Sequence, residues 1–227
     1  MISSFRSLSR IGFPLGLLFA PLALLAATPP ASPPSVQVRV EAPVVAYHSF
    51  PPGQPPPQVK ELSGREAGLC YTELATQIRI GVEYPRLSIK KPVVTVTSLE
   101  FVVGAKITIW VEEGSSPKIL DHENGHRAIS EYYYHQAQPL ARKLGEQAVG
   151  RKIPLNEKPT DAAIAAATEA LRAELLTEFE KQIDQRNRFA QAAFDTITDH
   201  SRNDVPNKEA VTKAIAEEER QWAAASP

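Results

Sequence analysis

The sequence predicts an α+β fold in which a small antiparallel sheet packs on two long α-helices. In the segments 37–46, 76–84 and 93–111 apolar and polar residues alternate, which is the period of half-buried strands. From residue 117 onward the apolar residues recur every three or four positions, the period of a helix that buries one face. The change of period therefore divides the chain into a strand-rich part and a helical part.

Length, charge and cysteine content exclude several classes of protein. The 227 residues suffice for one good-sized domain. A net charge of −1 leaves no excess of basic residues to bind a phosphate backbone, so we expect no nucleic-acid partner. Cys70 is the only cysteine, which excludes an intrachain disulfide and a cysteine-rich zinc site. Nothing near Cys70 in the sequence would activate it as a nucleophile, so we expect a buried small residue.

The first 27 residues have the pattern of a secretory signal peptide. Arg6 and Arg10 precede an apolar stretch at 11–27, and small residues follow at its end. A retained membrane anchor is the alternative, but two prolines interrupt the stretch and it is short for a span. We expect cleavage, a secreted or periplasmic protein, and no stable membrane anchor afterwards.

The rest of the chain divides into three parts. Residues 28–35 (TPPASPPS) have the composition of a Pro/Ser linker. We expect one folded domain at 36–205 and an additional C-terminal helix at 206–227.

Within the strand-rich part, 37–46 predicts a bent strand or a strand pair. Residues 93–103 and 106–111 predict two strands joined at Gly104, in the manner of a hairpin. The second of these, KITIWV, could form a sheet edge along which an extended peptide adds main-chain hydrogen bonds.

Both long helices begin with a capping signal. Ser116 and Pro117 suit the N-cap and first position of a helix that runs to Gly145. Thr160 suits the N-cap of a second helix that runs to about residue 193. Gly125 inside the first helix costs about 1 kcal/mol relative to alanine. Either the close approach of a strand or of substrate favours it, or the fold tolerates it.

The first helix carries the motif H-E-x-x-H, within ILDHENGHRA. His122 and His126 lie four residues apart, so both imidazoles can reach one metal ion from the same face of a helix. Glu123 lies about 100° further around the helix, where a general base for a bound water would stand. The alternative is a polar helix face that happens to carry these three residues.

A third ligand would distinguish the two interpretations, because catalytic zinc takes three protein ligands and keeps one position open. His135 follows His126 by nine residues and points to another side of a straight helix. His200 is the better candidate, because two antiparallel helices would return it to the neighbourhood of the first. It could instead be a histidine that interacts with the dipole of a helix C-terminus.

The two motifs HENGH and FDTITDH together resemble the DUF922 family of bacterial proteins, described as predicted secreted zinc-dependent proteases. The family pattern is H-E-x-G-H followed by Y-D-x-x-T-x-H-G, and the resemblance covers about residues 40–205. Phe194 stands where the family has tyrosine, and Ser201 where it has glycine. The matching positions are His122, Glu123, Gly125, His126, Asp195, Thr198 and His200.

The resemblance implies a metallopeptidase that acts on a peptide or protein substrate. His122, His126 and His200 would bind one Zn²⁺ per chain, and Glu123 would take the proton of the attacking water. Asp195 and Asp199 could orient a ligand histidine through its second ring nitrogen, or be helix-end carboxylates only.

Two other functions use the same ligands. The protein could be an envelope binding or structural protein that keeps zinc for folding without catalysis. It could also hydrolyse another amide, such as a peptide link of the cell wall.

Overall fold

The computed structural model describes residues 35–57, 59, 67–84, 92–155 and 158–225. The expected signal peptide and all but the last residue of the expected linker lie outside these ranges. Among the described residues no helix combines the length and the apolar character needed to cross a membrane.

A five-stranded sheet is built around one long strand, β4 (Val93–Glu112). β3 (Gly68–Glu83) runs antiparallel to it, and β5 (Lys152–Pro154) pairs antiparallel with its first residues. β1 (Ser35–Val40) and β2 (Val44–Phe50) follow each other along β4 and are both parallel to it. The sheet is therefore mixed, and the expectation of a purely antiparallel sheet was wrong for these two strands. Their connection to β4 includes the whole of β3, which gives the chain enough length to return in the same direction.

The expected hairpin at Gly104 is also absent, because its two strands are one. β3 pairs with β4 without a break from Ser98 to Val111, across Gly104. The alternation of buried side chains likewise passes from Val103 through Ala105 to Ile107. KITIWV therefore lies between β2 and β3 and forms no sheet edge, contrary to expectation.

The helical part follows the predicted period. α2 (Pro117–His135) and α3 (Ala137–Ala148) replace the single expected helix and meet at Gln136. The second long helix is continuous and consists of α4 (Asp161–Glu180), a π-helical turn (Lys181–Gln185) and α5 (Arg186–Thr198). α6 (Asn207–Ala225) ends the described chain. Both predicted caps are confirmed: the Ser116 side chain accepts from Lys118 N and that of Thr160 from Ala163 N.

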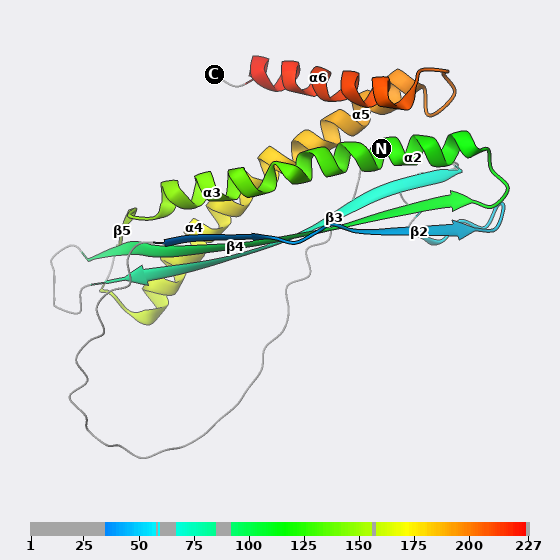
Figure 1. Cartoon of the computed structure of the whole chain (residues 1–227). Coiled ribbons are helices and arrows are strands. Elements are labelled where there is room, and N and C mark those ends of the chain that lie inside the picture. The colour runs from blue at the N-terminus through cyan, green and yellow to red at the C-terminus, as the bar shows by residue number, and fades with distance from the viewer. Residues whose placement is uncertain (1–34, 58, 60–66, 85–91, 156–157, 226–227) are drawn as a thin grey trace, which may run out of the picture.

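α2, α3, α5 and α6 lie on one face of the sheet, and α4 crosses the strands at the left of the view, with its first turns extending below them (Figure 1). From Leu99 to Ile109 the odd-numbered residues of β4 are buried, and Leu99, Phe101 and Val103 share a core with helical residues such as Phe179 and Phe194. Ala210 and Ala214 of α6 are fully buried in the same core. α6 therefore belongs to the same core as the rest of the described fold.

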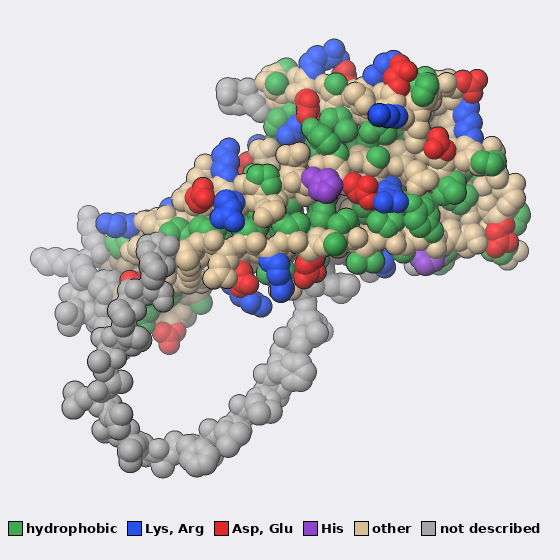
Figure 2. Space-filling view, in the orientation of Figure 1, with side chains coloured by type: hydrophobic (Ala, Val, Ile, Leu, Met, Phe, Trp, Pro, Cys, Tyr) green, Lys and Arg blue, Asp and Glu red, His purple; other side chains and the backbone are tan. Residues whose placement is uncertain are grey.

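The charges on the surface are mixed. Figure 2 shows basic and acidic side chains interspersed across the visible face. On the sheet, ion pairs join neighbouring strands, including Arg79–Glu100 and Lys106–Glu73. This distribution is that of an ordinary solvated surface.

Candidate metal centre

The two motif histidines point the same way from α2, as their spacing predicts. The Nε2 atoms of His122 and His126 are 3.1 Å apart. Their side chains are only 9% and 12% exposed. The pair therefore presents two nitrogen atoms to one point inside the molecule.

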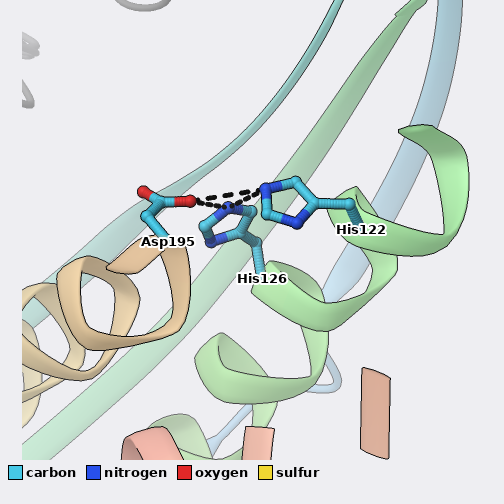
Figure 3. A group of neighbouring side chains, drawn as sticks. All are labelled: His122, His126 and Asp195. Atoms are coloured by element: carbon cyan, nitrogen blue, oxygen red, sulfur yellow. Dashed lines mark hydrogen bonds and ion pairs between the residues drawn. The ribbon is translucent and has the colours of Figure 1, made fainter. Parts of the chain in front are cut away.

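Asp195 of α5 completes a group of three (Figure 3). Its Oδ1 lies 3.3 Å from His122 Nε2 and 3.0 Å from His126 Nε2. Ligand atoms about 2.1 Å from a tetrahedral ion stand roughly 3.4 Å from one another. The three atoms thus fit one face of such a coordination tetrahedron, and the group could hold a metal ion.

The charges of this group are coupled. Burial lowers the pKa of His126, but the hydrogen bond to Asp195 and its charge outweigh burial and raise that pKa to about 9. Burial raises the pKa of Asp195, and the hydrogen bonds from His122 and His126 hold it well below its usual range instead. The carboxylate is therefore ionised and available as a ligand.

Gln191, one turn before Asp195 on α5, fixes the orientation of His126. Its Oε1 lies 2.5 Å from His126 Nδ1, and its Nε2 donates to the His126 carbonyl oxygen. A proton held at Nδ1 by an acceptor makes Nε2 the nitrogen directed at the metal position, from which a bound metal would displace the second proton. Gln191 was not among the predicted residues, although its four-residue spacing from Asp195 was a signal that could have found it.

His122 is held by stacking. Its ring lies on the ring of Phe194, with centroids 5.0 Å apart and planes 24° apart. Within the described part of the chain, the buried Nδ1 of His122 has no hydrogen-bond partner. Phe194 thus serves as a packing surface for both motif histidines.

Gly125 allows this packing. A Cβ at Gly125 would lie 2.3 Å from Phe194 Cζ and 2.5 Å from Asn207 Oδ1. The close approach that the glycine permits is therefore that of α5 and the start of α6. It is neither a strand nor a substrate that requires the glycine here.

Glu123 lies on the other side of the histidines, against β3. Its side chain is buried, and its Oε1 is 2.5 Å from the point where a Cβ of Gly68 would stand. The absence of a side chain at Gly68 therefore makes room for the carboxylate. Glu123 lines the same cavity as His122 and His126.

His200 lies beside the group rather than within it. Its Nδ1 is 3.8 Å from Asp195 Oδ1, and its partly exposed side chain lines the cavity. The backbone there is left-handed at Asp199, His200 and Ser201, with φ of 47°, 50° and 70°. Asp199 itself is exposed and pairs with Arg202 at 3.4 Å, so its carboxylate is not brought to the group.

A cavity of about 450 Å³ joins these residues. β3, α2 and α5 form its walls, and Cys70 lies in the β3 wall. Burial, and secondly the charge of Glu123, raises the pKa of the Cys70 thiol well above its ordinary value. The thiol stays protonated near neutral pH, as expected for a residue without a nucleophilic role.

No protein-family model matches the chain, and neither a curated protein nor a solved structure matches it.

Proposed function

We propose that the protein is an exported zinc-dependent peptidase that binds one Zn²⁺ per chain. The observation that carries the proposal is the convergence of His122, His126 and Asp195 beside the buried carboxylate of Glu123, in one cavity. Two histidines and a carboxylate are a ligand set of catalytic zinc. The resemblance to DUF922 and the signal-like N-terminus agree with this proposal.

The geometry favours Asp195 as the third ligand. Its Oδ1 is within 3.3 Å of both Nε2 atoms, whereas His200 Nδ1 is 3.8 Å from Asp195 Oδ1. The His200 assignment, which the sequence favoured, remains the alternative. Zinc content of Asp195→Ala and His200→Ala would distinguish the two, because loss of the true ligand removes the metal.

Zinc at this position supplies a Lewis acid that polarises a carbonyl and lowers the pKa of a water molecule. Glu123 then has the position of the general base, since it lines the cavity beside both histidines. Its carboxylate would take a proton from the attacking water and deliver it to the leaving amine. Gln191 keeps the His126 ring oriented throughout.

The free edge of β3 favours a peptide as substrate. β3 pairs with β4 on one side only among the described strands, and its residues 68–72 line the cavity. Glu112 N donates to Ala67 O, so residue 67 faces β4 and the alternate residues 68, 70 and 72 turn their backbone groups outward. An extended peptide could therefore pair with this edge next to the metal group. The edge is β3, not KITIWV.

The experiment that tests the proposal compares purified wild-type protein with Glu123→Gln. We expect about one zinc per chain in both proteins and hydrolysis of a mixed peptide library by the wild type only. The library also includes cell-wall peptides, so that the experiment tests hydrolysis of a peptide link of the cell wall as well. Absence of zinc in the reconstituted wild type would reduce the motif to a polar helix face and end the proposal.

A second function is favoured by the proximity of His200. If Asp195 and His200 both bound zinc with the two motif histidines, four protein ligands would close the site. The metal would then stabilise an envelope binding or structural protein without catalysis. In that case Asp195→Ala and His200→Ala would each lose zinc, no peptide would be cleaved, and Glu123→Gln would behave as wild type.

A further inference from the structure

The cavity has a second, polar end one helical turn away from the metal group. Side chains at four-residue spacing face one another across it on antiparallel helices. They are His122, His126 and Ser130 on α2, and Asp195, Gln191 and Asn187 on α5. β3 closes the third side with Thr72, which lies opposite Ser130.

These polar residues are buried and bonded to one another. Thr72 Oγ1 donates to Ser130 Oγ over 2.9 Å. Gln191 Nε2 lies 3.0 Å from Ser130 Oγ and 3.1 Å from Asn187 Oδ1. Thr72, Ser130 and Asn187 are between 4% and 8% exposed, yet all three line the cavity.

A count of donors and acceptors leaves two donors over. Each hydroxyl carries one hydrogen, so the bond between Thr72 and Ser130 uses one O–H and leaves the other to donate. Gln191 Nε2 has two hydrogens for three nearby acceptors, which are His126 O, Ser130 Oγ and Asn187 Oδ1. Asn187 Nδ2 donates to no group in the part of the chain that the structure describes. Neither donor is among the described buried atoms that lack a partner, and their residues line the cavity, so a ligand that brings an acceptor oxygen can bond to them there.

The charges around this end favour a neutral acceptor. Glu123 and Asp195 line the same cavity, and Arg188 at its wall is already paired with Asp184. A bound Zn²⁺ would partly offset these carboxylates. At this end of the cavity, however, the described lining has no unpaired basic side chain to hold a ligand carboxylate, whereas a carboxamide offers a carbonyl oxygen without charge.

We propose that Thr72, Ser130 and Asn187 form a subsite for an asparagine or glutamine side chain next to the scissile bond. This inference rests on the proposed zinc site. One helical turn, about 5.4 Å, separates Ser130 from His126. An asparagine or glutamine side chain can span this distance when the main-chain carbonyl group of the same substrate residue lies at the metal position.

The test measures binding rather than turnover. Amino-acid hydroxamates chelate zinc through the head group and present their side chain to the cavity. Calorimetry with the zinc-loaded protein should give a Kd about fivefold to tenfold lower for asparagine hydroxamate than for the near-isosteric leucine hydroxamate, the value of one net hydrogen bond. Aspartate hydroxamate should bind more weakly than the asparagine compound.

Two variants locate the preference. Asn187→Leu and the milder Ser130→Ala should each abolish the preference for asparagine over leucine hydroxamate. Thr196→Ala is the matched control, because Thr196 lines the cavity but takes no part in this polar network. It should keep the wild-type ratio of the two Kd values.

The outcomes separate this inference from the zinc site. Acetohydroxamate has no side chain and therefore reports only the open metal position. Suppose that acetohydroxamate binds and that leucine hydroxamate binds as tightly as asparagine hydroxamate, or more tightly. The subsite is then wrong, and the zinc site stands. Tighter binding of aspartate hydroxamate would also overturn the neutral subsite. If acetohydroxamate does not bind the zinc-loaded protein, the open catalytic site and the subsite both fail.

Discussion

At the scale of single residues, two glycines allow the side chains of the candidate metal group to come together. Gly125 and Gly68 each stand where a methyl group would enter a site side chain, the first Phe194 and the second Glu123. The motif is usually described by its histidines and glutamate. In this chain its glycine is what lets α5 approach closely enough for Asp195 to join them.

Gly125→Ala should therefore destabilise the protein although alanine is the better helix former. The added methyl group meets the Phe194 ring and Asn207, and we expect a loss of about 2 kcal/mol in the free energy of unfolding. Urea denaturation measures it. The double variant Gly125→Ala/Phe194→Leu should recover part of the loss, since leucine vacates the ring edge. Equal stability of wild type and Gly125→Ala would refute the contact.

At Ser201, in contrast to Gly125, a change to glycine should stabilise the protein. Its φ of 70° is a conformation that glycine adopts without steric cost, and glycine is the residue of the resembling family at this position. Ser201→Gly should raise the free energy of unfolding by about 0.5–1 kcal/mol. Ser201→Ala keeps the Cβ and is the control, with no gain expected. A thermal melt that ranks alanine with glycine would contradict this explanation.

At the scale of elements, the sequence predicted the motif on α2 well, but it did not predict how α5 packs against α2. The period and the cap placed His122, Glu123 and His126 on one helix, which the structure confirms. Asp195 was expected only as a residue that orients a ligand. Its place between the histidines depends on how deeply α5 packs against Gly125, and a helical period carries no information about that depth.

The strands show the same limit. Alternation identified apolar strand residues, but it could not distinguish one long strand from two joined at Gly104. Glycine is typical of turns, yet here it lies mid-strand opposite Ala75, and β3 pairs with β4 on both sides of it. On the other side of β4, β1 ends at Val103 and β2 begins at Lys106. Pairing with β2 and β3 is a tertiary contact that no local signal in the segment records.

α6 is held by one buried charge cluster. Glu218 accepts from Arg186 over 2.7 Å and 2.9 Å and from the Tyr133 hydroxyl over 2.6 Å. Glu218→Ala should cost about 3 kcal/mol, because it leaves Arg186 largely buried without its carboxylate. Glu217→Ala removes a partly exposed neighbour that pairs with the exposed Arg220 and should leave the urea midpoint almost unchanged. Similar midpoints for both variants would mean that α6 is not anchored by this cluster.

At the scale of the whole molecule, zinc bound at the proposed site should raise the free energy of unfolding. The three candidate ligands come from α2 and α5, which separate on unfolding. Free zinc at about 100 times its Kd should add roughly 2.7 kcal/mol to the free energy of unfolding. Melting curves with and without chelator measure the gain. Asp195→Ala should lose it, Glu123→Gln should retain it, and a zinc-independent wild type would contradict the site.

The overall class, α+β with the motif on the first long helix, was predictable from the switch of period near residue 116. The direction of β1 and β2 was not. A period of two is the same for parallel and antiparallel strands. The partly buried Val38, which pairs with Phe101, therefore carries no signal of the direction of β1. Only the path of the chain through β3 decides between them.

The central place of β4 also fixes an order of events during folding. Among the strands that the structure describes, β1 and β2 pair only with β4, and the partner of Ser35 is Ser98, more than sixty residues later. The first strands thus have no strand partner among the described residues until β4 has been synthesised. Such distant pairings make folding slow, because a long loop must close before any ladder forms. Until then the valines of β1 and β2 are exposed, which makes this interval the period of greatest risk of aggregation.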